Sequence, residues 1–158
     1  MLLGIDLGGT KIEGVVLKSK ENPNEIIRHR INTEEEKGYS QVINNIKSLV
    51  NHIENKINYR FKRLGIGTPG TIDPETGLLK NSNSQCLNDM PIQKDLAKTL
   101  DKIIFIQNDA NCFALAETLL GSVKDQYPDA KNVFGIIMGT GVGGGVIIDG
   151  KTVYGSQG

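Results

Sequence analysis

A chain of 158 residues is long enough for one domain with a hydrophobic core, or for one domain and part of a second. Its 18 basic and 18 acidic residues cancel, which argues against a surface for nucleic acid or anionic membranes. No apolar run approaches the roughly 20 residues of a membrane span, and no secretion signal opens the chain. We therefore expect a cytoplasmic protein without nucleic-acid or membrane partners, whose two cysteines, Cys86 and Cys112, are buried thiols.

The first predicted element is an apolar strand that ends in a glycine turn, residues 4–11. Side chains alternate along a strand, so Ile5 and Leu7 face a core while Asp6 faces whatever the turn holds. Glycine lets backbone N–H groups approach an anion, and a hydroxyl and an ammonium group follow the two glycines. The segment is therefore either a plain hairpin or a phosphate site with a metal ion near Asp6. The candidate phosphate ligands are Gly8, Gly9, Thr10 and Lys11.

An antiparallel meander and a long helix follow. Residues 12–17 and 25–31 are predicted to be strands. From 39 to 57 apolar residues recur at helical spacing, which predicts an amphipathic helix that covers the sheet. The acidic run 34–36 precedes this helix, where negative charge suits the helix dipole, so we interpret the run as structural.

The middle of the chain combines short strands with polar loops. A strand at 64–67 ends in a turn, and residues 71–79 predict a hairpin. The loop 80–85 is dense in amides and hydroxyls, among them Asn81 and Asn83. Such a loop is usually a solvated connection, but the same groups suit a polyhydroxylated ligand. Both interpretations stay open at this point.

A second helix and a buried strand lead to an acid and an amide. We expect a helix over 92–100, with Asp89 as its cap, and then an apolar strand at 103–106 that is buried on both faces. Asn108 and Asp109 end that strand, and in open α/β sheets ligands bind at the carboxyl ends of strands. The alternative is that Asp109 only caps the next helix. That helix is expected to bury the apolar residues Cys112, Leu115, Ala116, Leu119 and Leu120.

The opening pattern returns near the end of the chain. The polar stretch 125–130 predicts a domain boundary, so 1–124 forms one domain and 125–158 begins another. A strand at 134–138 then enters a second glycine turn, Gly139, Thr140 and Gly141, followed by a strand at 146–148. Ile137 stands where the first copy has Asp6.

Three other nucleotide motifs do not fit the second glycine run. A dinucleotide fingerprint must open a helix, whereas this run opens a strand. A protein-kinase glycine loop would begin a kinase domain. Residues 145–152 match the letters of a Walker A loop, but that loop must open a helix, whereas a hairpin turn is expected at 149–150. Two similar glycine hairpins, one per domain, remain, and together they predict a clamp on one polyphosphate.

These motifs together resemble the ROK family of sugar kinases. The similarity covers the whole chain and rests on residues 4–11, 108–112 and 139–145, which resemble the family's first phosphate motif, its catalytic segment and its second phosphate motif. The resemblance implies an α/β actin-like ATPase fold, in which a complete RNase H-like domain with a mixed sheet flanked by helices precedes the first strands of a related second domain.

The resemblance also implies a reaction. Asp109 would take a proton from a hexose hydroxyl, the 6-hydroxyl, as that oxygen attacks the γ-phosphate of ATP, with Mg²⁺ near Asp6. The sugar ligands would be Asn108, Gly67, Asn81 and Asn83, and the two glycine turns would hold the phosphates. The loop 80–84, with Leu87 and Asn88 after it, is most similar to bacterial fructokinase and mannokinase members, which implies a fructose, mannose or glucose substrate. Residues 108–115 also suit N-acetylglucosamine kinases, so an N-acetylhexosamine is the alternative substrate.

Family members continue beyond residues 155–158 into a Glu-x-Gly-His segment, a cysteine-rich zinc motif and an adenine site. We therefore expect this chain to be an N-terminal half that is inactive alone, with a structural zinc only in the missing part. Its second domain would leave strand edges unpaired, which predicts self-association or a homodimer. Two other classes stay open: a non-catalytic sugar- or nucleotide-binding remnant, and a ROK-type regulator. The regulator is disfavoured because such proteins carry a helix-turn-helix before the first strand.

Overall fold

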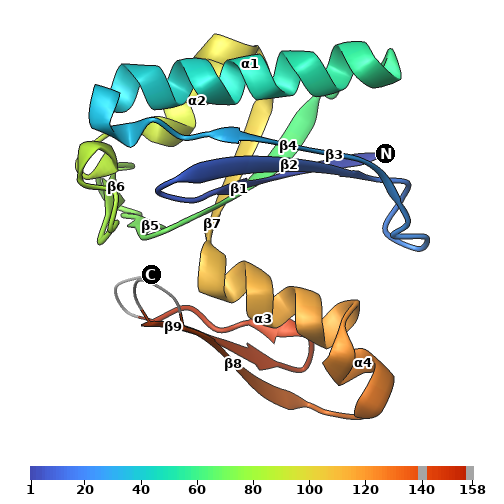
Figure 1. The fold of residues 1–158 in the computed structure, drawn as a ribbon. Helices are drawn as coiled ribbons and strands as arrows, with labels where there is room; N and C mark the ends of the chain where they lie inside the picture. The colour runs from blue at the N-terminus through green and yellow to red at the C-terminus, as the bar shows by residue number, and fades with distance from the viewer. Residues whose placement is uncertain (139–141, 156–158) are drawn as a thin grey trace.

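The computed structural model describes residues 1–138 and 142–155, which form two packed units (Figure 1). The first unit contains β1 (Leu2–Leu7), β2 (Lys11–Leu17), β3 (Glu25–Asn32), α1 (Tyr39–Ile57), β4 (Arg63–Thr68), β5 (Thr71–Ile72), β6 (Leu79–Lys80), α2 (Ile92–Leu100) and β7 (Ile103–Asn108), with two 3-10 turns, η1 (Glu35–Lys37) and η2 (Gln85–Leu87). The second contains α3 (Asp109–Leu119), α4 (Ser122–Gln126), β8 (Asn132–Met138), β9 (Val142–Ile148) and β10 (Lys151–Thr152).

The first unit is built on a mixed five-stranded sheet in the order β3-β2-β1-β4-β7. β1, β2 and β3 form an antiparallel meander, while β4 and β7 run parallel to β1. α1 and α2 lie on one face of this sheet (Figure 1). Because β1, β4 and β7 are parallel, their carboxyl ends meet at one edge, the edge that faces the second unit.

Burial alternates along the strands as the sequence predicts. Leu3, Ile5 and Leu7 are buried beneath the helices, whereas Asp6 is exposed on the opposite face. The predicted helix over 39–57 is confirmed, and its apolar stripe is buried: Val42, Ile43, Ile46, Leu49, Val50 and Ile53. These side chains and the sheet form the main hydrophobic core.

Two expectations about the first unit are wrong. Asp89 does not cap α2, because its backbone adopts a left-handed φ of 61° and the helix starts at Ile92 without a side-chain cap. β7 is not buried on both faces either. Ile104 is buried, but Ile103 and Phe105 are 56% and 57% exposed, because α1 and α2 cover only one face of the sheet.

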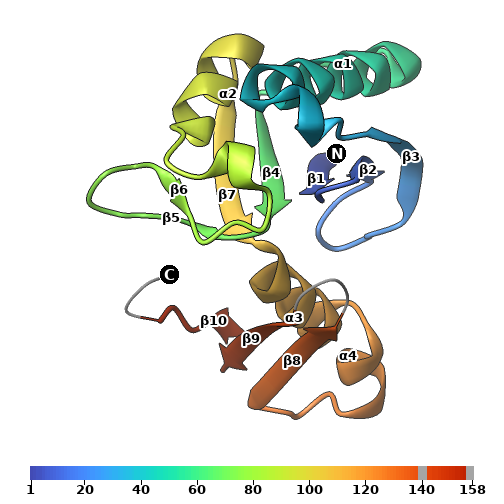
Figure 2. The same cartoon turned by 60° about the vertical axis from the view of Figure 1, so that its left-hand side comes forward.

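The second unit consists of α3 packed on a three-stranded antiparallel sheet, β10-β9-β8 (Figure 2). Glycines make the close approach possible: a Cβ added at Gly135 or Gly145 would lie 2.8 Å or 2.9 Å from the Cβ of Ala114. The predicted apolar face of this helix is therefore wrong. α3 buries Ala110, Asn111 and Ala114 instead, and Leu119 and Leu120 remain 41% and 46% exposed.

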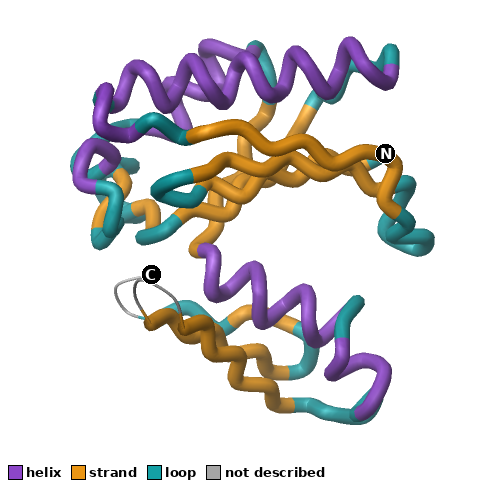
Figure 3. Tube along the Cα trace, viewed as in Figure 1, coloured by secondary structure: helices purple, strands orange, loops and turns teal. Residues whose placement is uncertain are grey.

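The chain passes from the first unit to the second where β7 runs directly into α3 (Figure 3). Since α3 packs on β8 and β9, we propose that the structural division lies at the end of β7. The boundary at 124/125 stays a prediction. None of the helices in residues 1–138 and 142–155 is long and apolar enough to cross a bilayer.

Candidate functional site

The register of the parallel strands brings several predicted site residues to one edge of the sheet. Asp6 on β1 pairs with Gly67 on β4, and Thr68 on β4 pairs with Asn108 on β7. These strand ends surround the start of α3, whose first residue is Asp109. The arrangement is the switch-point geometry at which α/β folds bind ligands.

Asn108 caps α3 and fixes its orientation. Its Oδ1 accepts hydrogen bonds from the backbone N–H groups of Ala110, at 3.1 Å, and Asn111, at 3.3 Å. Its Nδ2 donates to the carbonyl oxygen of Gly70 at 3.1 Å. Asn108 rather than Asp109 therefore caps this helix, so the capping role weighed for Asp109 belongs to its neighbour.

Asp109 is half-buried at the first position of α3. Its Oδ1 accepts a hydrogen bond from the backbone N–H of Ala110 at 2.8 Å. In the described part of the chain no hydrogen bond reaches Oδ2, so one carboxylate oxygen is available to a ligand.

The turn that follows β4 is held closely against β6. Gly70 has a φ of 85°, and a Cβ there would lie 2.3 Å from the carbonyl oxygen of Lys80. The polar loop is ordered by Asn88, which accepts from the Ser82 N–H and donates to the Ser82 carbonyl, both at 2.9 Å. Asn81 and Asn83 project from this ordered loop as exposed side chains. The role of Asn88 in ordering this loop was not predicted, because its partner Ser82 lies six residues away in an irregular loop.

The first glycine turn is tied to the residue after β3. The N–H of Gly8 donates to the carbonyl of Lys11 at 3.0 Å and closes the turn. Thr33 donates its hydroxyl to the carbonyl of Gly8 at 2.6 Å and its N–H to that of Thr10 at 2.9 Å. The N–H groups of Gly9 and Thr10 donate to no other group in the described residues, so this pair fits a phosphate oxygen.

A cavity of about 500 Å³ joins these parts and lies between the two units. It is lined by Gly8, Gly9, Thr10, Glu35, Pro69, Gly70, Asn81, Asn83, Ser84, Asn108, Asp109, Ala110, Ile137, Val142 and Gly143. Asp6, Lys11 and Gly67 are not part of the lining. A larger cavity of about 630 Å³ lies at the amino ends of the strands, near Leu2 and Phe105, and contains none of the predicted site residues. Gly139, Thr140 and Gly141 lie outside the described residues.

The pKa of the Asp6 carboxyl group depends on its neighbours at this edge of the sheet. Burial by the surrounding sheet, then the charges of Asp109 and Glu13, raise the pKa of Asp6 although the residue is exposed on the sheet face. Burial and the charges of Asp109 and Asp6 also raise the pKa of the Cys112 thiol. The described residues contain no group of three or more metal-ligating side chains. Mg²⁺ typically uses one or two carboxylates together with phosphate oxygens and water, and Asp6 fits that limited role.

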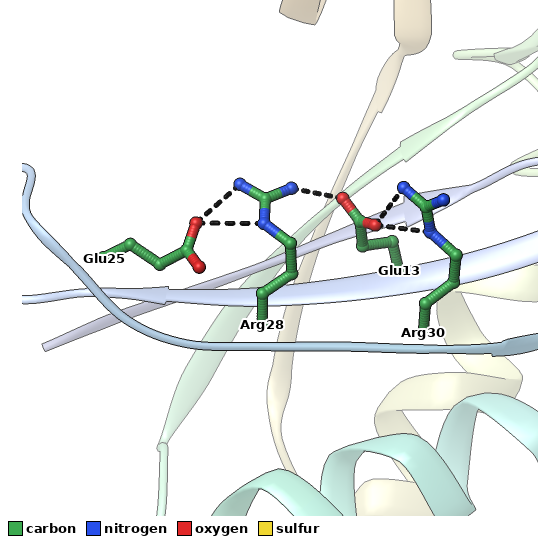
Figure 4. Close-up of polar contacts among 4 residues, drawn as sticks. All are labelled: Glu13, Glu25, Arg28 and Arg30. Carbon is green, nitrogen blue, oxygen red and sulfur yellow. Dashed lines mark hydrogen bonds and ion pairs between the residues drawn. The ribbon is translucent and has the colours of Figure 1, made fainter.

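A charged ladder on the outer face of the sheet surrounds Glu13 (Figure 4). Glu13 accepts hydrogen bonds from both Arg28 and Arg30, and Arg28 also pairs with Glu25 at 2.7 Å. Burial opposes ionisation of Glu13, but these two guanidinium groups lower its pKa overall. The charge of Arg30 also lowers the pKa of Asp6, but burial and the charges of Asp109 and Glu13 have the larger, opposite effect. The ladder therefore compensates part of the negative charge at this edge.

One residue of the cavity lining comes from the acidic run that the sequence analysis interprets as structural. Glu35, in the acidic run assigned a structural role, lines the cavity. A Cβ added at Gly9 would lie 3.5 Å from both carboxylate oxygens of Glu35 and 3.4 Å from the Ser84 hydroxyl. Glu34, the first residue of this run, binds Lys37, Gln41 and Asn45. Glu34 and Glu35 are adjacent and of the same type, so the sequence does not show that Glu35 lines the cavity.

Comparison with known proteins places this fold and site in a family. N-acetyl-D-glucosamine kinase of Aliivibrio salmonicida is 38% identical over 155 residues, which are 98% of this chain and 49% of that protein. The enzyme of the same name from Haemophilus influenzae is 37% identical over 158 residues, again 49% of its length. The chain thus spans about half the length of the curated relatives it matches.

Solved structures of other proteins share this fold. The ROK hexokinase of Thermus thermophilus has a TM-score of 0.81 at 30% identity, over 99% of this chain and 50% of that chain. A ROK glucokinase from Streptomyces griseus, solved with glucose and AMPPNP, shares the fold with a TM-score of 0.78 at 24% identity, over 98% of this chain and 46% of that chain. The expected α/β actin-like fold with a mixed sheet is confirmed. Residues 2–158 match the ROK family, and the chain therefore belongs to it.

Proposed function

We propose that this chain is the N-terminal half of an ATP-dependent kinase that phosphorylates N-acetylglucosamine. The relatives named N-acetyl-D-glucosamine kinases, at 37–38% identity, support the N-acetylhexosamine alternative better than the fructose and mannose class. The observation that carries the proposal is the cavity itself, because it unites the first glycine turn, the polar loop and Asp109.

Asp109 is the proposed general base. Its free Oδ2 would accept the proton of the sugar 6-hydroxyl while that oxygen forms a bond to the γ-phosphorus and the bond to ADP breaks. The anchored N–H groups of Gly9 and Thr10 would bind phosphate oxygens, and Gly139, Thr140 and Gly141 are proposed to do so from the second unit. Mg²⁺, held through Asp6, would neutralise the phosphate charge.

Asn108 is proposed to bind the sugar as well as to cap α3. An amide nitrogen carries two hydrogens, and the bond to Gly70 uses one of them, so the second is available for a sugar hydroxyl. Asn81 and Asn83 line the same cavity and would bind further hydroxyls. Gly67 supports the site from β4: a Cβ there would lie 3.6 Å from the Cys112 sulfur, in contact with the helix that carries Asp109.

The test is Asp109→Asn in the full-length protein. The amide preserves the shape of the side chain but cannot accept the proton, so we expect turnover to fall at least about 100-fold. Sugar affinity, measured by calorimetry, should change little. Asp125→Asn on the exposed α4 is the matched control and should retain full activity. Near-normal turnover of Asp109→Asn would contradict the assignment.

A second candidate is sugar binding without catalysis. A ROK family transcriptional regulator, homologous to the Mlc protein of E. coli, shares this fold with a TM-score of 0.77 at 19% identity, so the fold alone does not separate the two classes. Hexose binding by the full-length protein without any ATP turnover would favour this candidate.

A further inference from the structure

We propose that Glu35 is a specificity-determining residue, whose carboxylate accepts a hydrogen bond from a hydroxyl or acylamino N–H group of the sugar. The inference rests on the proposed function, since it assumes a sugar in the 500 Å³ cavity. It assigns a role to a residue outside the three motifs that carry the family resemblance.

Among the buried side-chain polar groups in the described part of the chain, Glu35 is the exception. Its Oε2 is buried and has no hydrogen-bond partner in the described residues. Glu54, by contrast, is buried with its partners in place, because its Oε1 accepts from the Phe61 N–H and from Lys102 Nζ, both at 2.8 Å. An unpaired buried carboxylate oxygen costs folding free energy, so its retention calls for a ligand that supplies the missing donor.

The position of Glu35 points to the cavity rather than to the protein interior. Its carboxylate and the Ser84 hydroxyl approach the same point beside Gly9, which has no side chain to fill it. Lys37, the nearest cation on η1, is paired with Glu34 at 2.5 Å. Two polar groups, one acceptor and one hydroxyl, thus face one region of the cavity next to the polar loop.

The chemistry of a carboxylate limits which ligand groups Glu35 can bind. An ionised carboxylate only accepts hydrogen bonds, and it repels a phosphate oxygen, so its partner is a neutral donor or a cation. Of these two, the proposed substrate supplies the neutral donor. A sugar ring offers several hydroxyl donors, and an N-acetylated sugar adds an amide N–H.

The experiment compares Glu35→Gln with Glu36→Gln in the full-length protein. Glu36 is exposed, so its variant controls for the loss of one charge from the same turn. We expect Glu35→Gln to raise the KM for the sugar about tenfold, because hydrogen bonds to charged groups are the stronger ones, and to change the KM for ATP less than about twofold. Glu36→Gln should change neither constant.

Unfolding of the ligand-free protein separates a binding role from a structural one. If Glu35 serves a ligand, removal of its unpaired charge leaves the melting temperature unchanged or raises it. A melting temperature that falls with Glu35→Gln would indicate a structural role and would overturn the proposal.

Deoxy sugars identify the donor. A sugar that lacks the group bound by Glu35 should bind about tenfold more weakly than the parent sugar to the wild type, and equally well to Glu35→Gln. Sugar affinity of the variant equal to that of the wild type, in turnover or in calorimetry, would overturn this inference while the proposed function stands. Absence of any sugar binding by the wild type would overturn both.

Discussion

Asp6 shows how a single residue is tuned by its neighbours. Its carboxyl is exposed on the sheet face, yet burial by the sheet and the charge of Asp109 raise its pKa, and Arg30 only partly offsets them. Folding therefore favours the protonated carboxyl. This contribution to stability is present below the unfolded value of 3.8 and is lost as the pH rises through the higher folded pKa.

The Asp6→Asn variant is expected to lack this pH-dependent loss of stability. The variant should gain free energy of unfolding relative to the wild type as the pH rises above 3.8, by less than about 1 kcal/mol because the residue is solvent-exposed. Urea unfolding over a pH series measures the difference. Glu13→Gln is the control, for which we expect the opposite effect. The arginines lower the pKa of Glu13, so this variant should lose free energy of unfolding relative to the wild type over a similar pH range. If the difference in free energy of unfolding between Asp6→Asn and the wild type does not vary with pH, the raised pKa of Asp6 is contradicted.

At the scale of elements, the position of Asp109 depends on the packing of α3. The helix begins at Asp109 and rests on strands whose glycines leave no side chain between them. A Cβ added at Gly145 would lie 2.6 Å from the carbonyl oxygen of Ala110, which is backbone and cannot rotate away. The glycines of the second unit thus set where the proposed general base stands.

Gly145→Ala should displace α3. We expect about 1–3 kcal/mol of lost stability in urea unfolding, as for other overpacked sites, and about tenfold lower turnover in the full-length protein. Gly65→Ala is the control, because nothing lies within 4 Å of the Cβ position in β4. If both variants unfold and react alike, close packing does not set the position of the helix.

At the scale of the whole molecule, the second unit leaves one face of its sheet uncovered. The outer face of β8 and β9 carries Phe134, Ile136, Met138 and Val142, which are 66%, 52%, 80% and 79% exposed. Contiguous apolar surface of this kind is typical of an interaction face. The chain also spans only half the length of its relatives, so activity is expected of the full-length protein.

The 158-residue chain alone should therefore self-associate and phosphorylate no sugar. Light scattering measures the first and a coupled ADP assay the second. Met138→Lys places a charge on the apolar face and should reduce association, whereas Gln126→Lys on α4 adds the same charge elsewhere and should not. A strictly monomeric chain, or robust phosphorylation by it, would contradict this prediction.

Local patterns in the sequence were sufficient to predict most helices and strands and to place Asn108 and Asp109 at a strand end. The reason is physical: alternation along Leu3, Ile5 and Leu7 and the helical stripe of α1 are set by neighbours a few residues away. Errors arose where a distant element decided the outcome. α3 buries alanines rather than leucines because glycines of β8 and β9 approach it.

The sequence by itself determined the family, the strand and helix order and the polar residues at the carboxyl ends of β1 and β7. Only the tertiary structure decided which of three adjacent glutamates enters the cavity and that Asn108 is fastened to Gly70. Those facts depend on contacts between residues far apart in the chain, and periodicity carries no record of such contacts.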